Sequence, residues 1–153
     1  MAQAWDESAI GEIIGAEMDF FGADLWFAPG MNIHLNPLCG RNFEHYSKDP
    51  LLSGRCAAAD TMGVQKHHGG TTIKHFAFNN QEDNRMHVNA HVSERTAREI
   101  YLKGFEIAVK MAQPKASMSS YNLINSIARS QQHNATSPQS GSFEPDCGLI
   151  HFS

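Results

Sequence analysis

The 153-residue sequence has little cysteine, no long apolar run and no block of charge of one sign. Its three cysteines, Cys39, Cys56 and Cys147, are odd in number and widely spaced. Such spacing gives neither a disulfide framework nor a paired metal-binding motif. A reducing compartment fits this cysteine usage best, and we expect a cytoplasmic protein.

No stretch approaches the roughly 18 to 20 apolar residues that a membrane-spanning helix needs. Residues 1–18 also lack the charged start and the apolar segment of an export signal. The formal net charge is −4, and the 12 lysines and arginines are scattered along the chain. Without a basic stripe or a polybasic anchor, we expect neither a nucleic acid nor a membrane as a partner.

Helical and strand-like patterns alternate from the start of the chain. Apolar residues at helical spacing predict a helix over residues 8–21, and the apolar run at 25–29 predicts a strand. Asp49 can cap a second helix over 50–68, with Pro50 at its first position. A crossover between two parallel strands is the expected result.

The same alternation continues in the next part of the chain. Residues 71–76 predict a second strand, and Ser93 caps a third helix that Pro114 closes. Residues 115–122 then predict a third strand. Strands that alternate with helices over this length indicate consecutive βα units of a parallel α/β fold.

Polar side chains follow each of the three predicted strands. They are Arg41 and Glu44 after the first strand, Lys74 and His75 at the end of the second, and Tyr121 and Asn122 at the end of the third. Because the carboxyl ends of parallel strands meet at one edge of a sheet, we expect one shared pocket there.

Each of these residues also has a simpler interpretation. Arg41 and Glu44 can form an ion pair that only braces a loop. Lys74 and His75 can be ordinary polar residues at a strand end, and Tyr121 can be a half-buried packing aromatic. Only the ordered set favours a binding site.

Nine histidines leave open a second hypothesis, a metal-binding module. His67 and His68 are adjacent, and His87 and His91 have the i,i+4 spacing of helical metal ligands. The second pair lies in a loop-like stretch, however, and no cysteine is near either pair.

The last part of the sequence has a different character. Residues 128–146 are rich in Ser, Gln, Asn and Pro and have no regular periodicity, and a short apolar run follows at 147–153. We therefore predict a domain over residues 1–127 and an irregular tail, disordered or frameshifted, over 128–153.

Four segments in this order resemble the amino-terminal barrel domain of glycoside hydrolase family 3, the β-glucosidase and β-xylosidase type. They are LWFAPGMNIHLNPLCGRNFEHYSKDPLLSG, TTIKHFAFNNQEDNRM, VSERTAREIYLKGFEIAVKMAQP and SMSSYNLIN. The resemblance implies a partial (β/α)8 TIM-type barrel of about three to four βα units. It also implies retaining hydrolysis of β-glucosides or oligosaccharides, with no cofactor.

The resemblance assigns roles to individual residues. Arg41, Lys74 and His75 match positions that bind sugar hydroxyls, and Tyr121 matches a tyrosine near the nucleophile. Three further residues match supporting positions: Glu44, Arg85 and Asn122. These seven residues are the predicted site.

Departures from the family pattern limit the expected activity. The first family strand, with its Asp-Gly-Pro loop, has no match here, and neither the nucleophilic Asp nor the acid/base Glu can be identified. Gly148, Leu149 and Ile150 fall about where the next barrel strand would start. We expect the isolated chain to be inactive, and a non-catalytic sugar-binding or pseudogene remnant is the alternative.

An incomplete barrel also has consequences for association. A closed barrel needs on the order of 250 residues, so the sheet is expected to have open edges. Unpaired strand edges and apolar helix faces favour association with other chains or aggregation.

Overall fold

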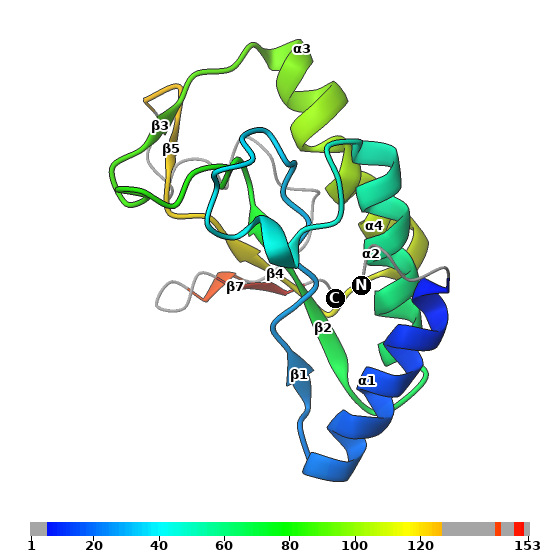
Figure 1. Cartoon of the computed structure of the whole chain (residues 1–153). Helices are drawn as coiled ribbons and strands as arrows, with labels where there is room; N and C mark the ends of the chain where they lie inside the picture. Colours follow the sequence, from blue (N-terminus) through cyan, green and yellow to red (C-terminus); the bar gives the residue numbers. More distant parts are fainter. Residues whose placement is uncertain (1–5, 127–142, 145–148, 152–153) are drawn as a thin grey trace.

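A computed structural model of the chain describes residues 6–126, 143–144 and 149–151 (Figure 1). The main helices are α1 (Glu7–Phe21), α2 (Pro50–Val64) and α4 (Lys103–Ala112). Shorter helical segments are η1 (Asn42–Glu44), α3 (Glu94–Thr96) and the π-helical turn η2 (Ala97–Tyr101). The strands are β1 (Leu25–Trp26), β2 (Gly70–Phe76), β3 (Asn89–Ala90), β4 (Ala116–Ser119), β5 (Leu123–Ile124), β6 (Phe143–Glu144) and β7 (Leu149–His151).

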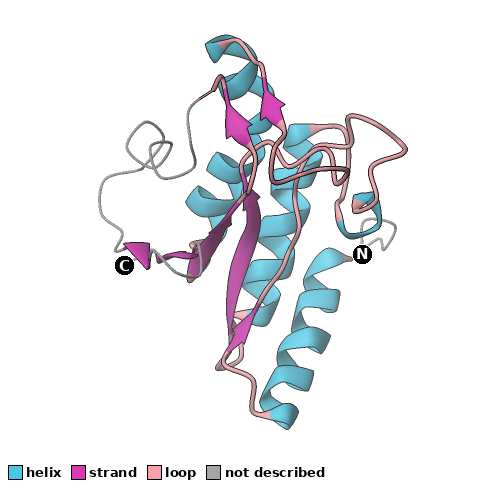
Figure 2. Ribbon diagram, turned by 90° about the vertical axis from the view of Figure 1, so that its left-hand side faces the viewer, coloured by secondary structure: helices cyan, strands magenta, loops and turns pink. Residues whose placement is uncertain are grey.

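The main sheet has the order β1-β2-β4-β7-β6, and its first three strands are parallel. Leu25 pairs with Gly70, and Thr72 pairs with Ala116. Helices α1, α2 and α4 lie side by side along this parallel part of the sheet (Figures 1 and 2). Three parallel strands in chain order with helices on one side are the arrangement of a partial (β/α)8 barrel, as the sequence predicted.

The predicted helix starts are confirmed by hydrogen bonds at the caps. Asp49 Oδ1 accepts from the backbone N–H groups of Leu51 and Leu52, at 2.7 and 3.2 Å. Ser93 caps the third helical segment by accepting from the N–H of Thr96 at 3.2 Å. Such caps satisfy backbone donors that have no partner within the helix.

Two predicted helices have different bounds from those expected. The second ends at Val64 rather than near residue 68, because the backbone N–H groups of Lys66 and His67 donate to carbonyls three residues earlier, those of Gly63 and Val64, and so replace the α-helical pattern by a tight turn. The third is interrupted by η2, where the N–H of Leu102 donates to the Ala97 carbonyl, five residues earlier.

Two predicted strands are shorter in the structure. Only residues 25–26 of the first form β1, although Gly30 still makes an isolated parallel bridge to Lys74. The third predicted strand is β4 alone, and β5 beyond it pairs in parallel with β3 in a separate two-stranded sheet. The sequence analysis missed this small sheet.

The segment 148–150 is not the next parallel strand of a barrel. Its described part belongs to β7, which pairs antiparallel with β4, Ile150 opposite Ser117. The other residues of the predicted tail lie mostly outside the described part of the chain.

Small residues let the three main helices pack closely. A Cβ atom on Gly63 of α2 would lie 2.7 Å from the Gly11 Cα atom of α1, and one on Gly54 would lie 2.9 Å from the Gly104 carbonyl oxygen of α4. The main core between helices and sheet consists of Met31, Tyr46, Cys56, Ala57, Ile73, Phe105 and Ala108. This layer positions the carboxyl ends of β2 and β4, where the polar residues gather.

Among the described helices, none is long and apolar enough to cross a membrane.

Candidate functional site

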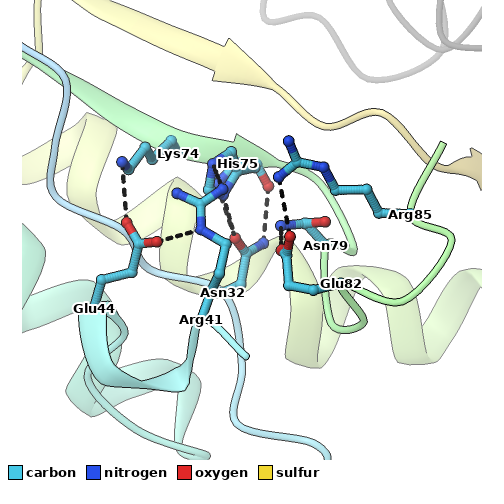
Figure 3. A network of polar contacts seen from close by, with 8 residues as sticks. All are labelled: Asn32, Arg41, Glu44, Lys74, His75, Asn79, Glu82 and Arg85. Carbon is cyan, nitrogen blue, oxygen red and sulfur yellow. Dashed lines mark hydrogen bonds and ion pairs between the residues drawn. The ribbon is translucent and has the colours of Figure 1, made fainter. Parts of the chain in front are cut away.

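Four of the predicted site residues meet at the carboxyl end of β2 (Figure 3). Arg41 and Glu44 come from the loop that contains η1, and Lys74 and His75 come from β2. Their side chains converge although the two segments lie thirty positions apart in the sequence. These two strand ends therefore meet at one edge of the sheet, as predicted, whereas a pocket for a sugar stays a prediction.

The Glu44 carboxylate lies between two cationic side chains. Its Oε1 accepts a hydrogen bond from Arg41 Nε, and its Oε2 lies 3.0 Å from Lys74 Nζ. Partial burial raises the pKa of this carboxyl, but the hydrogen bonds and charges of Arg41 and Lys74 outweigh burial and lower the pKa to about 2. Glu44 is therefore an anion at neutral pH that holds both cations in place.

His75 is held on both sides of its ring. Arg41 Nη1 lies 2.8 Å from His75 Nε2, and Asn32 Oδ1 lies 3.1 Å from His75 Nδ1. Burial, together with the charges of Arg41 and Lys74, lowers the pKa of His75 to about 3, so the ring is neutral at neutral pH. Because a guanidinium only donates, Nε2 is the acceptor, and the single ring proton lies on Nδ1, facing Asn32.

Asn32 is a site residue that the sequence analysis missed. Its Oδ1 also accepts from the His75 backbone N–H at 2.9 Å, and its Nδ2 donates to the His75 carbonyl at 2.8 Å. Asn32 is buried, so these bonds fix the backbone as well as the ring of His75. The only signal in the sequence was its place in the loop after the first strand.

The His45 ring lies near the rings of both His34 and His75. The ring centroids are 6.1 and 6.4 Å from that of His45. Burial is the main reason why the pKa of His45 falls to about 4. The Gly30 backbone packs closely against these side chains, because a Cβ atom on Gly30 would lie 3.0 Å from His45 Cδ2 and 3.1 Å from Glu44 Oε2.

A second group of polar contacts contains Arg85 and Tyr121. Arg85 Nη1 lies 3.0 Å from Glu82 Oε2, and Glu82 Oε1 accepts from Asn79 Nδ2 at 2.9 Å. The Arg85 guanidinium lies over the Tyr121 ring, with Cζ 5.0 Å from the ring centroid. Tyr121 is 43% exposed and is therefore not an ordinary core aromatic.

Asn122 has a different environment from its predicted neighbours. It is buried, and its Nδ2 donates to the carbonyls of Ala77 and Leu123, both at 3.3 Å. Ser120 also donates to the Ala77 carbonyl, at 2.6 Å. Asn122 thus joins the loops after β2 and β4, and its role in supporting a sugar site stays a prediction.

A cavity of about 800 Å³ lies beside these groups, between the loop at 35–40 and the segments 78–83 and 88–93. Glu82 lines this cavity, whereas Arg41, Lys74 and His75 do not. Most amide side chains of the lining bind nearby backbone atoms, as Gln81 Nε2 does to the Asp83 carbonyl.

The histidine pairs of the metal hypothesis have other surroundings. His67 pairs with Asp19, and a Cβ atom on Gly15 of α1 would lie 2.5 Å from the His67 ring. His87 and His91 flank β3 rather than one face of a helix. Within residues 6–126, 143–144 and 149–151, no group of three His, Cys, Asp or Glu side chains could hold a metal ion.

Comparison with known proteins identifies the family. Residues 1–142 match the model of the glycosyl hydrolase family 3 N terminal domain. Beta-glucosidase A of Butyrivibrio fibrisolvens is 46% identical over 136 residues, which are 87% of this chain and 16% of that protein. An exo-alpha-(1->6)-L-arabinopyranosidase of Bifidobacterium breve is 43% identical, over 87% of this chain and 18% of that protein.

A solved structure agrees with the sequence match. Beta-glucosidase 3B from Thermotoga neapolitana in complex with glucose is 54% identical and superposes with a TM-score of 0.79. The match covers 82% of this chain and 18% of that chain, so the present chain corresponds to less than a fifth of these proteins. The sequence match, the parallel strands and the shared fold agree: the chain belongs to glycosyl hydrolase family 3, and its structure is part of that family's amino-terminal barrel.

Proposed function

We propose that this chain supplies the sugar-binding part of a retaining β-glucosidase site, in which Arg41, Lys74 and His75 bind hydroxyls of a terminal glucosyl unit. The observation that carries the proposal is their convergence around Glu44 at the carboxyl end of β2. In a (β/α)8 barrel this end of the strands carries the active site. The β-glucosidases among the relatives support glucose as the bound sugar.

The unused hydrogen-bond donors of the site suit a sugar. Arg41 uses Nε for Glu44 and one Nη1 donor for His75, which leaves three of its five N–H donors for a ligand. Lys74 likewise uses one of its three donors for Glu44. A hydroxyl would bind His75 Nε2 as a donor, in exchange for Arg41, because the other ring nitrogen faces Asn32.

The proposed division of labour separates binding from catalysis. No residue of this sequence matches the nucleophilic Asp or the acid/base Glu of the family. Both groups are needed to form and resolve a glycosyl-enzyme, so we expect the 153-residue polypeptide by itself to bind glucose without hydrolysing glucosides.

A titration of the 153-residue polypeptide with D-glucose, followed by two-dimensional NMR, tests the proposal. We expect saturable chemical-shift changes, largest for the Arg41 and Lys74 side-chain signals, and weaker binding of D-xylose, which lacks the hydroxymethyl group of glucose. Absence of saturation by glucose would overturn the proposal. Stoichiometric covalent labelling by a mechanism-based 2-deoxy-2-fluoro glucoside would overturn the separation of binding from catalysis.

We further propose that the exposed edge of the sheet beside β1 is covered by other protein when the site is functional. β1 is an edge strand in the described sheet, and Phe20 and Phe21 at the end of α1 are 83% and 77% exposed. Such an edge with apolar neighbours favours association. Size-exclusion chromatography at increasing concentration should therefore show oligomers, and a monomer at all concentrations would contradict this.

A further inference from the structure

We propose that Glu82 is a positioning residue, which holds the Arg85 guanidinium against Tyr121 at the rim of the sugar site. The inference rests on the proposed function for its consequence in binding, but its geometry can be tested without any sugar. Figure 3 shows the Glu82 carboxylate in contact with both Asn79 and Arg85, apart from the contacts around Glu44.

The Glu82 carboxylate is held by a second partner besides Arg85. Asn79, which is 3% exposed, donates from Nδ2 to Glu82 Oε1 at 2.9 Å. The Arg85 backbone N–H donates to the Glu82 carbonyl at 3.3 Å, which fixes the turn that joins the two residues. One oxygen of the carboxylate is therefore held by a buried amide, and the other is presented to Arg85.

Only a carboxylate satisfies this position. Both partners of Glu82, Asn79 Nδ2 and Arg85 Nη1, are hydrogen-bond donors. A carboxylate offers two acceptor oxygens, whereas a glutamine amide offers one oxygen and turns its NH2 group toward one of the two donors. Glu82→Gln therefore loses one of the two bonds and all of the charge attraction to Arg85.

Arg85 connects Glu82 to Tyr121, a residue beyond the end of a different strand. Its guanidinium lies over Tyr121, which follows β4, whereas Asn79 follows β2. A cation over an aromatic ring is attracted by the ring face, and this contact has a defined geometry only if the cation is held. Glu82 thus links the β2 and β4 loops through one charged chain of contacts, which gives Tyr121 and Arg85 a fixed place beside the sugar.

The test compares Glu82→Gln with Asp83→Asn in the 153-residue polypeptide. Asp83 is an exposed carboxylate next in sequence, so the control removes the same charge from the same loop. The first measurement is the NMR signal of the Arg85 Nε–H group without sugar, because the Tyr121 ring shifts it upfield while the stacking persists. We expect Glu82→Gln to move this signal toward its unstacked position and Asp83→Asn to leave it in place.

The second measurement is a double-mutant cycle on D-glucose affinity. We expect Glu82→Gln to weaken binding about tenfold in the native background and less than about twofold in an Arg85→Ala background, since Glu82 acts through Arg85. An equal loss in both backgrounds, or an unchanged Arg85 signal in Glu82→Gln, overturns the proposal. Glu82→Asp, which retains the charge but withdraws it by one methylene, gives the same comparison if Glu82→Gln does not fold.

A failure of the proposed function has a different signature. If the unsubstituted polypeptide does not bind glucose, sugar binding is wrong, but the Arg85 signal still decides whether Glu82 positions the guanidinium. A shifted signal then supports the positioning, and an unshifted signal overturns it.

Discussion

Two glutamates with the same acidity occupy opposite kinds of surroundings in this chain. Glu44 lies at the carboxyl end of β2 between Arg41 and Lys74, and Glu106 lies on the outer face of α4 between Lys103 and Lys110. Each has a pKa of about 2. The Glu44 side chain is 18% exposed, whereas that of Glu106 is 42% exposed.

The physical origin of the low pKa differs between the two. At Glu44, burial acts against ionisation, and the two cations must overcome it. At Glu106, hydrogen bonds from Lys110 and Lys103 lower the pKa with almost no opposing burial. A low pKa alone therefore does not indicate a functional residue. The effect of substituting the glutamate depends on whether the cations that lose their counter-charge are buried or exposed.

Glu44→Gln is expected to have the largest effect of the changes considered. It leaves the partly buried Arg41 and Lys74 without their shared anion, so we expect a loss of about 2 to 3 kcal/mol in the free energy of unfolding, because removing one partner of a buried ion pair is costly. Glucose affinity should fall at least tenfold as both cations move. Urea denaturation at pH 7 and glucose titration measure the two effects, with Glu106→Gln as the matched control. Equal effects of the two substitutions would contradict the comparison.

The double variant Glu44→Gln with Lys74→Met should recover about 1 to 2 kcal/mol of that stability, since it removes the cation that Glu44→Gln leaves unpaired. Glucose affinity should not recover, because Lys74 is a proposed ligand of the sugar. The same two assays separate these outcomes. A double variant less stable than Glu44→Gln alone would mean that Lys74 does not depend on Glu44.

The sequence predicted the helix starts and the order of the parallel strands because these depend on local signals. Asp49 with Pro50, and Ser93, mark helix starts through their own side-chain chemistry, and the structure confirms them. The predicted end of α2 was wrong, because the chain leaves the helix through a turn at Lys66 and His67 that no capping residue in the sequence marks. The pairing of β3 with β5 was missed because strands of two residues are too short to show a periodicity in the sequence.

The site was predictable only in part. The meeting of Arg41, Glu44, Lys74 and His75 follows from parallel strands that end at one edge, together with the family motifs. The role of Asn32 depends on the fold of the loop after β1, which brings its amide to both the ring and the backbone of His75. Glu82 could not be predicted, because the sequence does not distinguish it from other acidic loop residues. Only the structure shows that Asn79 and Arg85 lie beside its carboxylate.

The buried histidines near Glu44 should make the chain sensitive to acid at a higher pH than Glu44 itself does. His45 and His75 have pKa values of about 4 and 3 in the folded chain, below the ordinary value of 6.5. The unfolded chain therefore binds protons first as the pH falls below about 6.5, so stability is full above that pH and is lost on the way down. Glu44 adds a further loss only between about pH 4.5 and pH 2, where its folded form stays ionised.

His45→Gln should reduce the pH dependence of the unfolding free energy between pH 6.5 and pH 5. The reduction is at most about 1.4 kcal/mol per pH unit, the limit for one proton. Urea denaturation at several pH values gives the slope, and His87→Gln, at an exposed loop position, is the control that should leave it unchanged. An unaltered slope in His45→Gln would show that this buried ring does not contribute to the acid sensitivity.

Glu106→Gln is expected to have the smallest effect, in spite of the low pKa of Glu106. Lys103 and Lys110 are 47% and 73% exposed, so water solvates both cations once the carboxylate is gone. Exposed ion pairs typically contribute less than about 1 kcal/mol, and salt screens them. We expect a loss below about 0.5 kcal/mol in dilute buffer that disappears at high salt, with no change in glucose affinity. A loss that persists at high salt, or a weaker glucose complex, would mean that the α4 surface and the β2 site are coupled through the helix layer. The two glutamates would then differ in their distance from the site rather than in the burial of their partners.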